Sequence, residues 1–261
     1  MAKKVISRIL ICTICALTLM GCEKKEQVES KKDVRPLEIE IKSEEIEKNE
    51  IEEKGLIVID AGHQANGNSE QEPIGPGASE TKAKVSSGTS GVSTGIPEYI
   101  LTLEVAEKLR VALEKESYKV IMVRESHDVD ISNFERAQIA NDNNADAFIR
   151  IHANGSENQE VSGAMTICQT PDNPYNGELY EQSMLLSTYV LDNLVEATGC
   201  VKERVWETDT MSGINWCQIP TTIVEMGYMT NPEEDQLMAT DEYQYKIVDG
   251  IVAGIERFMN N

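Results

Sequence analysis

Short runs of apolar, mostly β-branched residues recur from residue 55 onward, and amphipathic stretches lie between them. A continuous apolar run of this kind is typical of a strand that is buried on both faces. The runs occupy residues 56–59, 118–123, 147–151, 163–168 and 221–226. The helical patterns occupy residues 100–113, 134–140, 185–194 and 247–258. Strands that alternate with helices favour a mainly parallel sheet, so the sequence predicts an α/β fold, a three-layer α/β/α sandwich.

One segment inside this region breaks the pattern. Residues 64–95 are rich in Gly, Ser and Pro and show little periodicity. A loop of this length within a compact domain is usually functional or mobile. The sequence leaves open whether this loop gates a site or binds an activator.

The beginning of the chain has the pattern of a secretion signal. Three basic residues among the first eight precede an uncharged stretch, 9–21, which is too short to span a bilayer. Residues 19–22 (Leu-Met-Gly-Cys) resemble the lipobox of a bacterial lipoprotein, in which the cysteine receives a diacylglyceryl group. We therefore expect a lipoprotein signal peptide over 1–22 and a lipid anchor at Cys22. The alternative is an ordinary signal peptide in which Cys22 has no special role.

The signal is followed by a segment of different composition. Residues 23–54 are dense in charge and poor in apolar side chains. Such a segment cannot bury enough apolar surface to offset the entropy that it loses on ordering. We therefore expect a disordered tether over 23–54 and one folded catalytic domain over 55–261. The protein would then act outside the cytoplasm, held to the membrane of the cell envelope.

The balance of charge excludes one large class of function. The chain has 45 acidic against 24 basic residues, for a net charge of −21. A general nucleic-acid-binding protein needs a basic surface to displace counterions from phosphates. We therefore expect no nucleic-acid partner.

Three cysteines fall in the expected folded domain, namely Cys168, Cys200 and Cys217. Their spacing fits no zinc cluster, and because their number is odd they can form at most one disulfide. At least one of them is expected to be a buried free thiol.

Two histidines and one glutamate are expected at the same edge of the sheet. His63 follows the first apolar run, His152 ends another, and Glu98 opens a helix directly after Pro97. The carboxyl ends of parallel strands meet at one edge, where sites gather. Two imidazoles and a carboxylate with one open position form the ligand set of a catalytic zinc site. Taken singly, a hydrogen-bonded structural role is the default for each histidine. His127 lies in a polar loop and is expected at the surface.

A further acid interrupts an apolar run. Glu225 lies within the run at 221–226, and a carboxylate in a buried strand is costly unless it is paired or coordinated. It could form a salt bridge or a hydrogen bond to the backbone. Alternatively, it could act as a general base on the attacking water, with its pKa raised by partial burial. Asp60 could orient the ring of His63, and Asn154 could contact substrate or form a turn.

Four motifs in order resemble the zinc-dependent N-acetylmuramoyl-L-alanine amidases. They are Ile-Asp-Ala-Gly-His ending at His63, Glu98 with a leucine five residues later, Ala-Asp-Ala-Phe-Ile-Arg-Ile-His-Ala-Asn around His152, and Pro-Thr-Thr-Ile-Val-Glu-Met-Gly-Tyr-Met-Thr-Asn around Glu225. The resemblance implies hydrolysis of the amide between N-acetylmuramic acid and L-alanine in peptidoglycan. It also implies that His63, Glu98 and His152 bind Zn²⁺ and that Glu225 is catalytic.

The sequence departs from the family pattern at a few positions. Gln64 and Ala65 stand where a pair of glycines is common, and Arg150 stands where serine is usual. These departures bear on loop conformation and substrate fit, not on the metal ligands.

Two other functions remain open at this stage. The same metal chemistry would serve a zinc peptidase that cuts within the stem peptides. The fold could also belong to a non-catalytic lipoprotein that binds the cell wall, although a binding module has no need of a buried Glu225. The expected partners are peptidoglycan and the membrane lipid, and a protein activator is left open.

Overall fold

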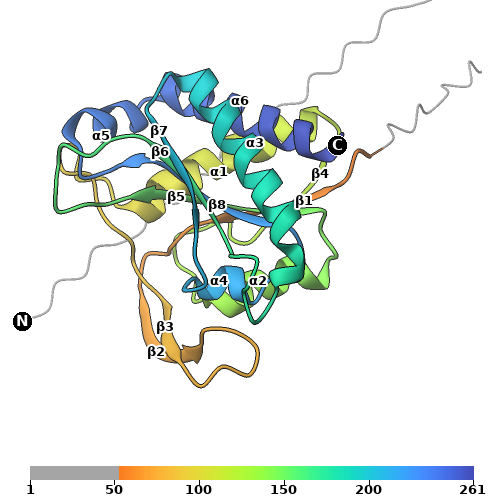
Figure 1. Ribbon diagram of the computed structural model, residues 1–261. Coiled ribbons are helices and arrows are strands. Elements are labelled where there is room, and N and C mark those ends of the chain that lie inside the picture. Colours follow the sequence, from red (N-terminus) through yellow and green to blue (C-terminus); the bar gives the residue numbers. More distant parts are fainter. Residues whose placement is uncertain (1–52) are drawn as a thin grey trace, which may run out of the picture. The chain divides into compact units, whose positions relative to one another are not determined.

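The computed structural model describes residues 53–261 (Figure 1). The expected signal peptide (1–22), the anchor Cys22 and all but the last two residues of the expected tether (23–54) lie outside the described residues. No helix in the described part is long and apolar enough to cross a membrane.

A six-stranded sheet forms the centre of the fold, with strand order β4-β1-β5-β8-β6-β7. The strands are β1 (Leu56–Ala61), β4 (Lys119–Met122), β5 (Ala147–Asn154), β6 (Ala164–Cys168), β7 (Lys202–Glu207) and β8 (Thr221–Tyr228). Neighbouring strands run parallel except β6 and β8, which pair antiparallel. The predicted α/β fold with a mainly parallel sheet is confirmed.

Helices cover both faces of this sheet (Figure 1). One layer contains α1 (Glu98–Lys115), α3 (Tyr180–Thr198) and α6 (Asp241–Met259). The opposite layer contains α2 (Asn133–Asp142) and the short α4 (Ser212–Asn215). The remaining helices are a 3-10 turn (Gly177–Leu179) and α5 (Pro232–Met238).

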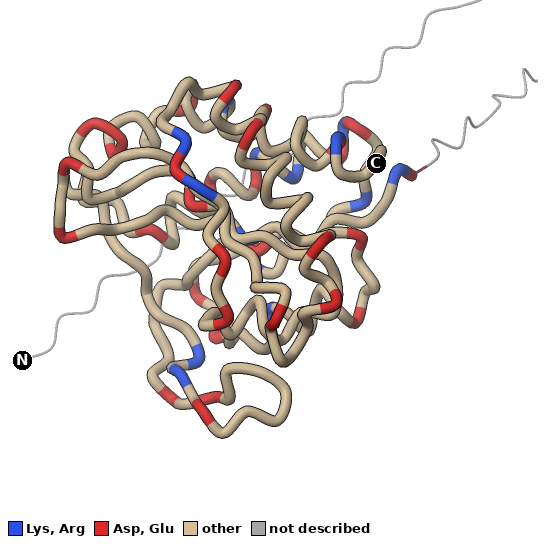
Figure 2. Tube along the Cα trace, viewed as in Figure 1, with Lys and Arg blue, Asp and Glu red and all other residues tan. Residues whose placement is uncertain are grey.

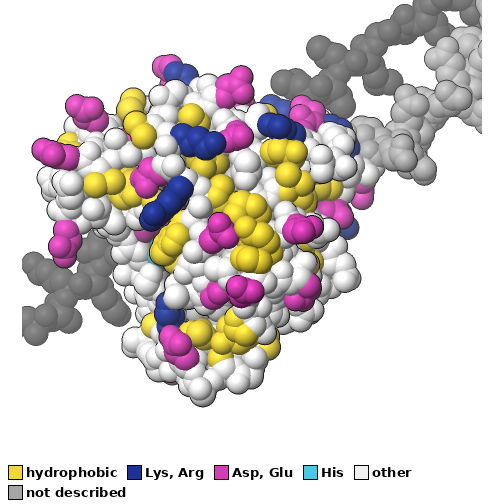
Figure 3. Space-filling model, viewed as in Figure 1, with side chains coloured by type: hydrophobic (Ala, Val, Ile, Leu, Met, Phe, Trp, Pro, Cys, Tyr) yellow, Lys and Arg dark blue, Asp and Glu magenta, His cyan; other side chains and the backbone are white. Residues whose placement is uncertain are grey.

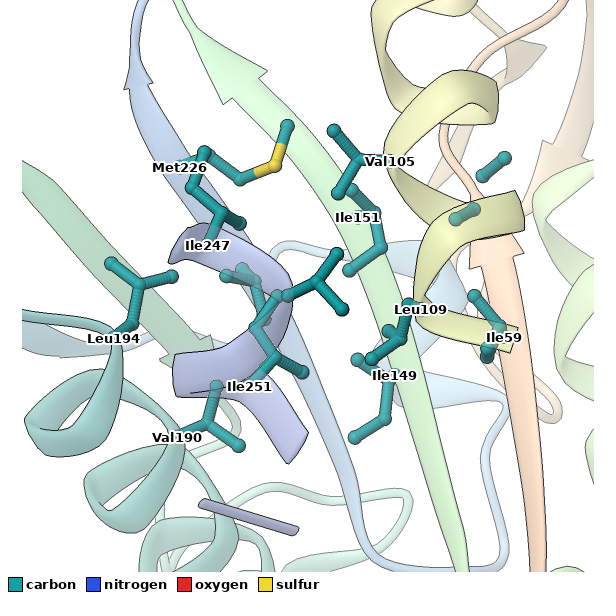
Figure 4. Close-up of a cluster of buried hydrophobic side chains, with 14 of the residues drawn as sticks. Ile59, Val105, Leu109, Ile149, Ile151, Val190, Leu194, Met226, Ile247 and Ile251 are labelled. Atoms are coloured by element: carbon teal, nitrogen blue, oxygen red, sulfur yellow. The ribbon is translucent and has the colours of Figure 1, made fainter. Parts of the chain in front are cut away.

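The main core lies between the sheet and the layer of α1, α3 and α6 (Figure 4). Successive residues of a strand point to opposite faces, so Ile57 and Ile59 join this core while Val58 packs toward α2. Phe148 of β5 belongs to the same cluster as Val58, on the face of the sheet that is covered by α2. Burial on both faces explains why the strands read as continuous apolar runs.

The expected irregular segment 64–95 contains regular structure, which corrects the sequence prediction. Strands β2 (Asn68–Pro73) and β3 (Thr81–Val85) form an antiparallel hairpin that projects from the sheet on the side of α2 and α4 (Figure 1). Most side chains of the hairpin are exposed, so it carries no apolar face that sequence analysis could detect. Side chains of the opposite layer hold it, because Asn133 donates to the carbonyl of Lys84 (2.8 Å) and Trp216 donates to that of Pro73 (2.9 Å).

Cys168, Cys200 and Cys217 are all free, and two of them are buried. Acidic side chains are spread over the described surface, as Figures 2 and 3 show for one face.

Candidate metal centre and active site

Three side chains from three elements converge at the carboxyl edge of the sheet. His63 follows β1, Glu98 is the first residue of α1, and His152 lies in β5. Oε1 of Glu98 is 3.0 Å from Nε2 of His63 and 3.2 Å from Nδ1 of His152. The two ring nitrogens are 3.1 Å apart. Three ligand atoms therefore surround one point.

The parallel pairing of β1 with β5 brings the two histidines together. Ala61 is in register with Ile151, and the Gly62 N–H donates to the carbonyl of Ile151 (2.9 Å). A Cβ at Gly62 would lie 2.4 Å from the His152 ring, so only glycine fits between the strands here. His63 itself adopts a positive φ of 63°, and its ring lies edge to face with that of His152, with the ring centroids 4.7 Å apart.

Loop 86–97 fixes the third side chain. The Glu98 N–H donates to the carbonyl of Thr89 (2.9 Å), and the Thr89 N–H donates to Oε2 of Glu98 (2.9 Å). The Ala153 N–H donates to Oε1 (3.1 Å). These bonds aim the carboxylate at the two imidazoles and keep it in one position.

His63 is oriented by Ser86, a contact that sequence analysis missed. Its Nδ1 lies 3.0 Å from both the carbonyl and the hydroxyl of Ser86. Donation from Nδ1 to the carbonyl leaves the lone pair of Nε2 free to bind a metal. Ser86 lies in the Gly- and Ser-rich segment, where nothing in the sequence distinguishes it from its neighbours.

Asp60 does not orient His63, so that prediction is wrong. Its carboxylate is fully buried and pairs with Nη1 of Arg136 (2.6 Å) and Nε of Arg150 (2.9 Å). These partners lie 76 and 90 residues away in the sequence, so no local pattern could indicate them. Asn154 lines the site cavity and also accepts from the Gly155 N–H in a turn, so both of its expected roles stay open.

The protonation states of the cluster suit a metal ion. Burial lowers the pKa of His152 to about 4, despite its hydrogen bond to Glu98. Burial alone would raise the pKa of Glu98, but the hydrogen bonds from His152 and His63 outweigh it and hold that pKa well below its usual range. At neutral pH His152 is neutral and Glu98 is ionised, as metal binding requires. Two imidazole nitrogens and one carboxylate oxygen are a ligand set of catalytic zinc.

Glu225 lies beside this cluster on β8, in register with His152. Its Oε2 is buried and has no hydrogen-bond partner among the described residues. Burial and, to a smaller extent, the charge of Glu98 raise the pKa of Glu225 to about 8, against the opposing effect of Arg150. A carboxyl group with this pKa can both accept and donate a proton near neutral pH.

A cavity of about 800 Å³ gives access to these groups. Residues of the β2–β3 hairpin, the loop after β5 and the start of α4 form its other walls. His127, by contrast, is partly buried in its loop beside Tyr99 and does not line the cavity.

The Asp60 pair leads to a prediction on stability. Asp60→Asn would leave Arg136 and Arg150 buried without their anion, and we expect it to lower the free energy of unfolding by about 3–5 kcal/mol. The two arginines hold the pKa of Asp60 below its ordinary value although burial opposes them. This stability is therefore present above the ordinary carboxyl pKa and is lost on acidification. Urea unfolding of the full-length chain at several pH values would measure both effects.

Asp192→Asn is the matched control, because Asp192 forms a surface pair with Lys202 and should change stability by less than about 1 kcal/mol. Equal stabilities of the Asp60 and Asp192 variants would contradict the importance of the buried pair.

The fold and the site together define a class of protein. A mainly parallel sheet with a cavity and polar side chains at the carboxyl ends of its strands is typical of an α/β enzyme. The chain belongs to the N-acetylmuramoyl-L-alanine amidase family, whose sequence model matches residues 57–257.

Individual relatives agree with this assignment. The chain is 29% identical to N-acetylmuramoyl-L-alanine amidase Rv3717 of Mycobacterium tuberculosis over 218 residues, which cover 78% of this chain and 87% of the relative. It is 28% identical to the germination-specific N-acetylmuramoyl-L-alanine amidase of Bacillus subtilis, over 66% of this chain and 75% of the relative. Its structure is similar to that of the amidase Ami1 from Mycobacterium smegmatis, with a TM-score of 0.71, 27% identity and coverage of 80% and 98%. The chain is therefore an enzyme of the peptidoglycan amidase type.

Proposed function

We propose that this enzyme is a zinc-dependent N-acetylmuramoyl-L-alanine amidase in which His63, Glu98 and His152 bind Zn²⁺ and Glu225 is the general base. The observation that carries the proposal is the convergence of three ligand atoms, 3.0–3.2 Å apart, beside a carboxyl group that has no partner. Family membership supports the substrate, an amide at the junction of glycan and peptide.

The protein residues divide the chemistry between them. Zinc, when bound, would acidify water and polarise the amide carbonyl. Glu225 would take the proton of the attacking water and return it to the departing alanine nitrogen, which cannot leave as an amide anion at neutral pH. Its raised pKa suits both steps, because the group must be a base first and an acid afterwards.

The alternatives are less well supported. A non-catalytic wall-binding protein would have no use for a partly buried Glu225 whose buried Oε2 has no hydrogen-bond partner in residues 53–261, since such a group costs stability. A zinc peptidase would use the same ligands, but the relatives reported above are amidases. Only the bond that is cut distinguishes these two enzymes.

We also propose that the enzyme acts outside the cytoplasm and is anchored to the membrane through a lipid on Cys22. The basic start, the uncharged stretch and the Leu-Met-Gly-Cys sequence support this location. The charged segment 23–54 would then connect the anchor to the catalytic domain.

Product analysis tests the proposed function. We expect the full-length chain in detergent to release peptides that begin at L-alanine from purified peptidoglycan. A chelator should abolish the release and added zinc should restore it, with mass spectrometry identifying the products.

Peptides cut within the stem would instead indicate the peptidase. A folded, zinc-loaded preparation that releases nothing, even with added cell-envelope extract to supply an activator, would contradict the proposal.

A further inference from the structure

Beneath the site lies a buried cluster with an excess of positive charge. Among residues 53–261, Asp60 is the one carboxylate in direct contact with Arg136 and Arg150, and both of these guanidinium groups are almost fully buried. Arg124 is buried close by and also acts on this group electrostatically. Two guanidinium groups therefore share one carboxylate, and the third forms no salt bridge with any described residue, although Glu107 and Asp60 both act on it electrostatically. Burying an uncompensated charge is costly, so an excess of this kind calls for an explanation.

Two of the three arginines use their donors within the protein. Arg124 donates to backbone carbonyls, including those of Ala61 (2.8 Å) and Tyr99 (2.7 Å). Arg136 donates to Asp60 and, through its other nitrogens, to the carbonyls and side chains around it. Hydrogen bonds within the protein therefore explain why Arg124 and Arg136 are buried.

Arg150 differs from both. Its Nε donates to Asp60 (2.9 Å) and its Nη2 to Asn133 (2.8 Å), whereas Nη1 donates to no other residue in 53–261. A guanidinium group carries five N–H donors, so several of these are left over. Arg150 is 96% buried, since only 4% of it is exposed, and yet it lines the site cavity.

The guanidinium group is also held in place. A Cβ at Gly213 of α4 would lie 2.0 Å from Nη1 of Arg150. Any larger residue at position 213 would therefore clash with the guanidinium group in this position. The bonds to Asp60 and Asn133 fix its plane from the other sides. A planar, pre-oriented guanidinium with free donors is suited to a carboxylate.

A second cation faces the same space from the hairpin. Lys82 of β3 lines the cavity, and its Nζ donates to the carbonyl of Thr210 (2.7 Å). Because this partner is a neutral carbonyl, the charge of Lys82 is not compensated by it. Arg150 and Lys82 are the two basic side chains among the described residues that line the cavity, which is also lined by the acidic Glu98, Glu157 and Glu225, so any attraction for an anion must come from these two cations.

The distance between Arg150 and the metal ligand His152 indicates which part of the substrate would carry an anionic group that binds Arg150. Arg150 precedes His152 by two residues of β5, so the two side chains share a face and their Cα atoms are roughly 7 Å apart. An extended peptide covers at most about 3.6 Å per residue. A group on the residue that follows the alanine would therefore reach Arg150 when the scissile amide lies at His152.

We propose that Arg150 and Lys82 form a subsite for a free carboxylate on the stem-peptide residue next to the L-alanine. In the peptide stem this residue is a glutamate joined through its side chain, so its α-carboxyl group is either free or present as the amide. The inference rests on the proposed amidase function and adds selectivity to it: the enzyme prefers stems in which this carboxyl group is free.

Two substrates that differ only at this group test the proposal without any mutation. They are soluble muramoyl peptides with D-isoglutamate or with D-isoglutamine after the L-alanine, given to the zinc-loaded full-length chain. We expect kcat/KM to be about 10- to 100-fold higher for the acid, mainly through a lower KM, as for a charge-assisted hydrogen bond. Equal values would overturn the inference but leave the amidase in place. Cleavage of neither substrate would contradict the proposed function and the inference with it.

Variants then assign the preference to these side chains. Arg150→Gln should remove most of the preference for the D-isoglutamate substrate, and Arg150→Lys should retain part of that preference. Lys82→Gln should lower it severalfold, and because Lys82 is exposed this variant should fold normally. Lys84→Gln is the matched control, since Lys84 lies on the same strand, pairs with Glu70 and does not line the cavity. A preference that persists unchanged in both Arg150→Gln and Lys82→Gln would contradict the assignment.

Discussion

Glu225→Gln is expected to lower kcat for amide hydrolysis by about 10²- to 10⁴-fold while zinc content stays unchanged. The amide side chain has the same size but cannot take a proton from water or return it to the leaving nitrogen, which is the contribution of a general acid–base group. Glu225 is not among the three side chains whose ligand atoms converge, so its loss should leave the metal in place. Product release from peptidoglycan and metal analysis of the same preparation would measure both quantities.

The same variant should also change how stability depends on pH in the metal-free protein. The pKa of Glu225 is raised from 4.5 to about 8 by burial, so the folded state favours the protonated group. The corresponding stability is fully present below about 4.5 and is lost as the pH rises through about 8. Relative to Glu225→Gln, the wild-type chain should therefore become less stable over this range.

Glu233→Gln, at an exposed position of α5, is the control and should alter neither activity nor this pH dependence. Wild-type turnover in Glu225→Gln would remove Glu225 from the mechanism.

The sequence predicts the strands of the sheet better than the parts around it. Strands β1 and β5 are buried on both faces, so their apolar runs identify them without ambiguity. Strand β7 was missed because it lies at an edge, and four of the six residues in its sequence, Lys-Glu-Arg-Val-Trp-Glu, are charged. The β2–β3 hairpin was missed for a related reason, since only one residue of each strand is buried.

The direction of β6 follows from the length of its connection to β5. Only residues 155–163 separate it from β5, and they contain no helix. A parallel crossover needs about a dozen residues or more, so this connection favours a reversal of direction, as observed. The periodicity of the strands alone contains no information on their direction.

The site was predictable where it depends on strand ends and not where it depends on distant side chains. His63 follows β1 and His152 lies near the end of the adjacent parallel strand β5, and this placement alone brings them to one edge. The partners of Asp60, by contrast, come from α2 and β5 through packing that no local pattern reports. The sequence therefore predicted that Asp60 orients His63, whereas its carboxylate pairs with Arg136 and Arg150.

His152→Ala is expected to lose the metal and, with it, the activity. His152 supplies one of three ligand atoms that lie within 4.8 Å of one another, and two ligands with an open position cannot hold Zn²⁺ as three do. Loss of hydrogen-bond partners behind zinc ligands already costs about 10- to 100-fold in affinity, so loss of a ligand should cost more. Metal content after dialysis and zinc titration with a fluorescent indicator would measure the change.

His127→Ala is the matched control, because it removes an imidazole that lies beside Tyr99 and outside the cavity. This variant should bind zinc as the wild-type chain does. If His152→Ala also kept its zinc, His152 would not be a ligand, and the 3.2 Å contact between Nδ1 and Glu98 would be an ordinary hydrogen bond. If His152→Ala lost zinc but remained folded, His152 would be a ligand. The burial that lowers the pKa of His152 to about 4 would then serve to keep the ring neutral, as metal binding requires.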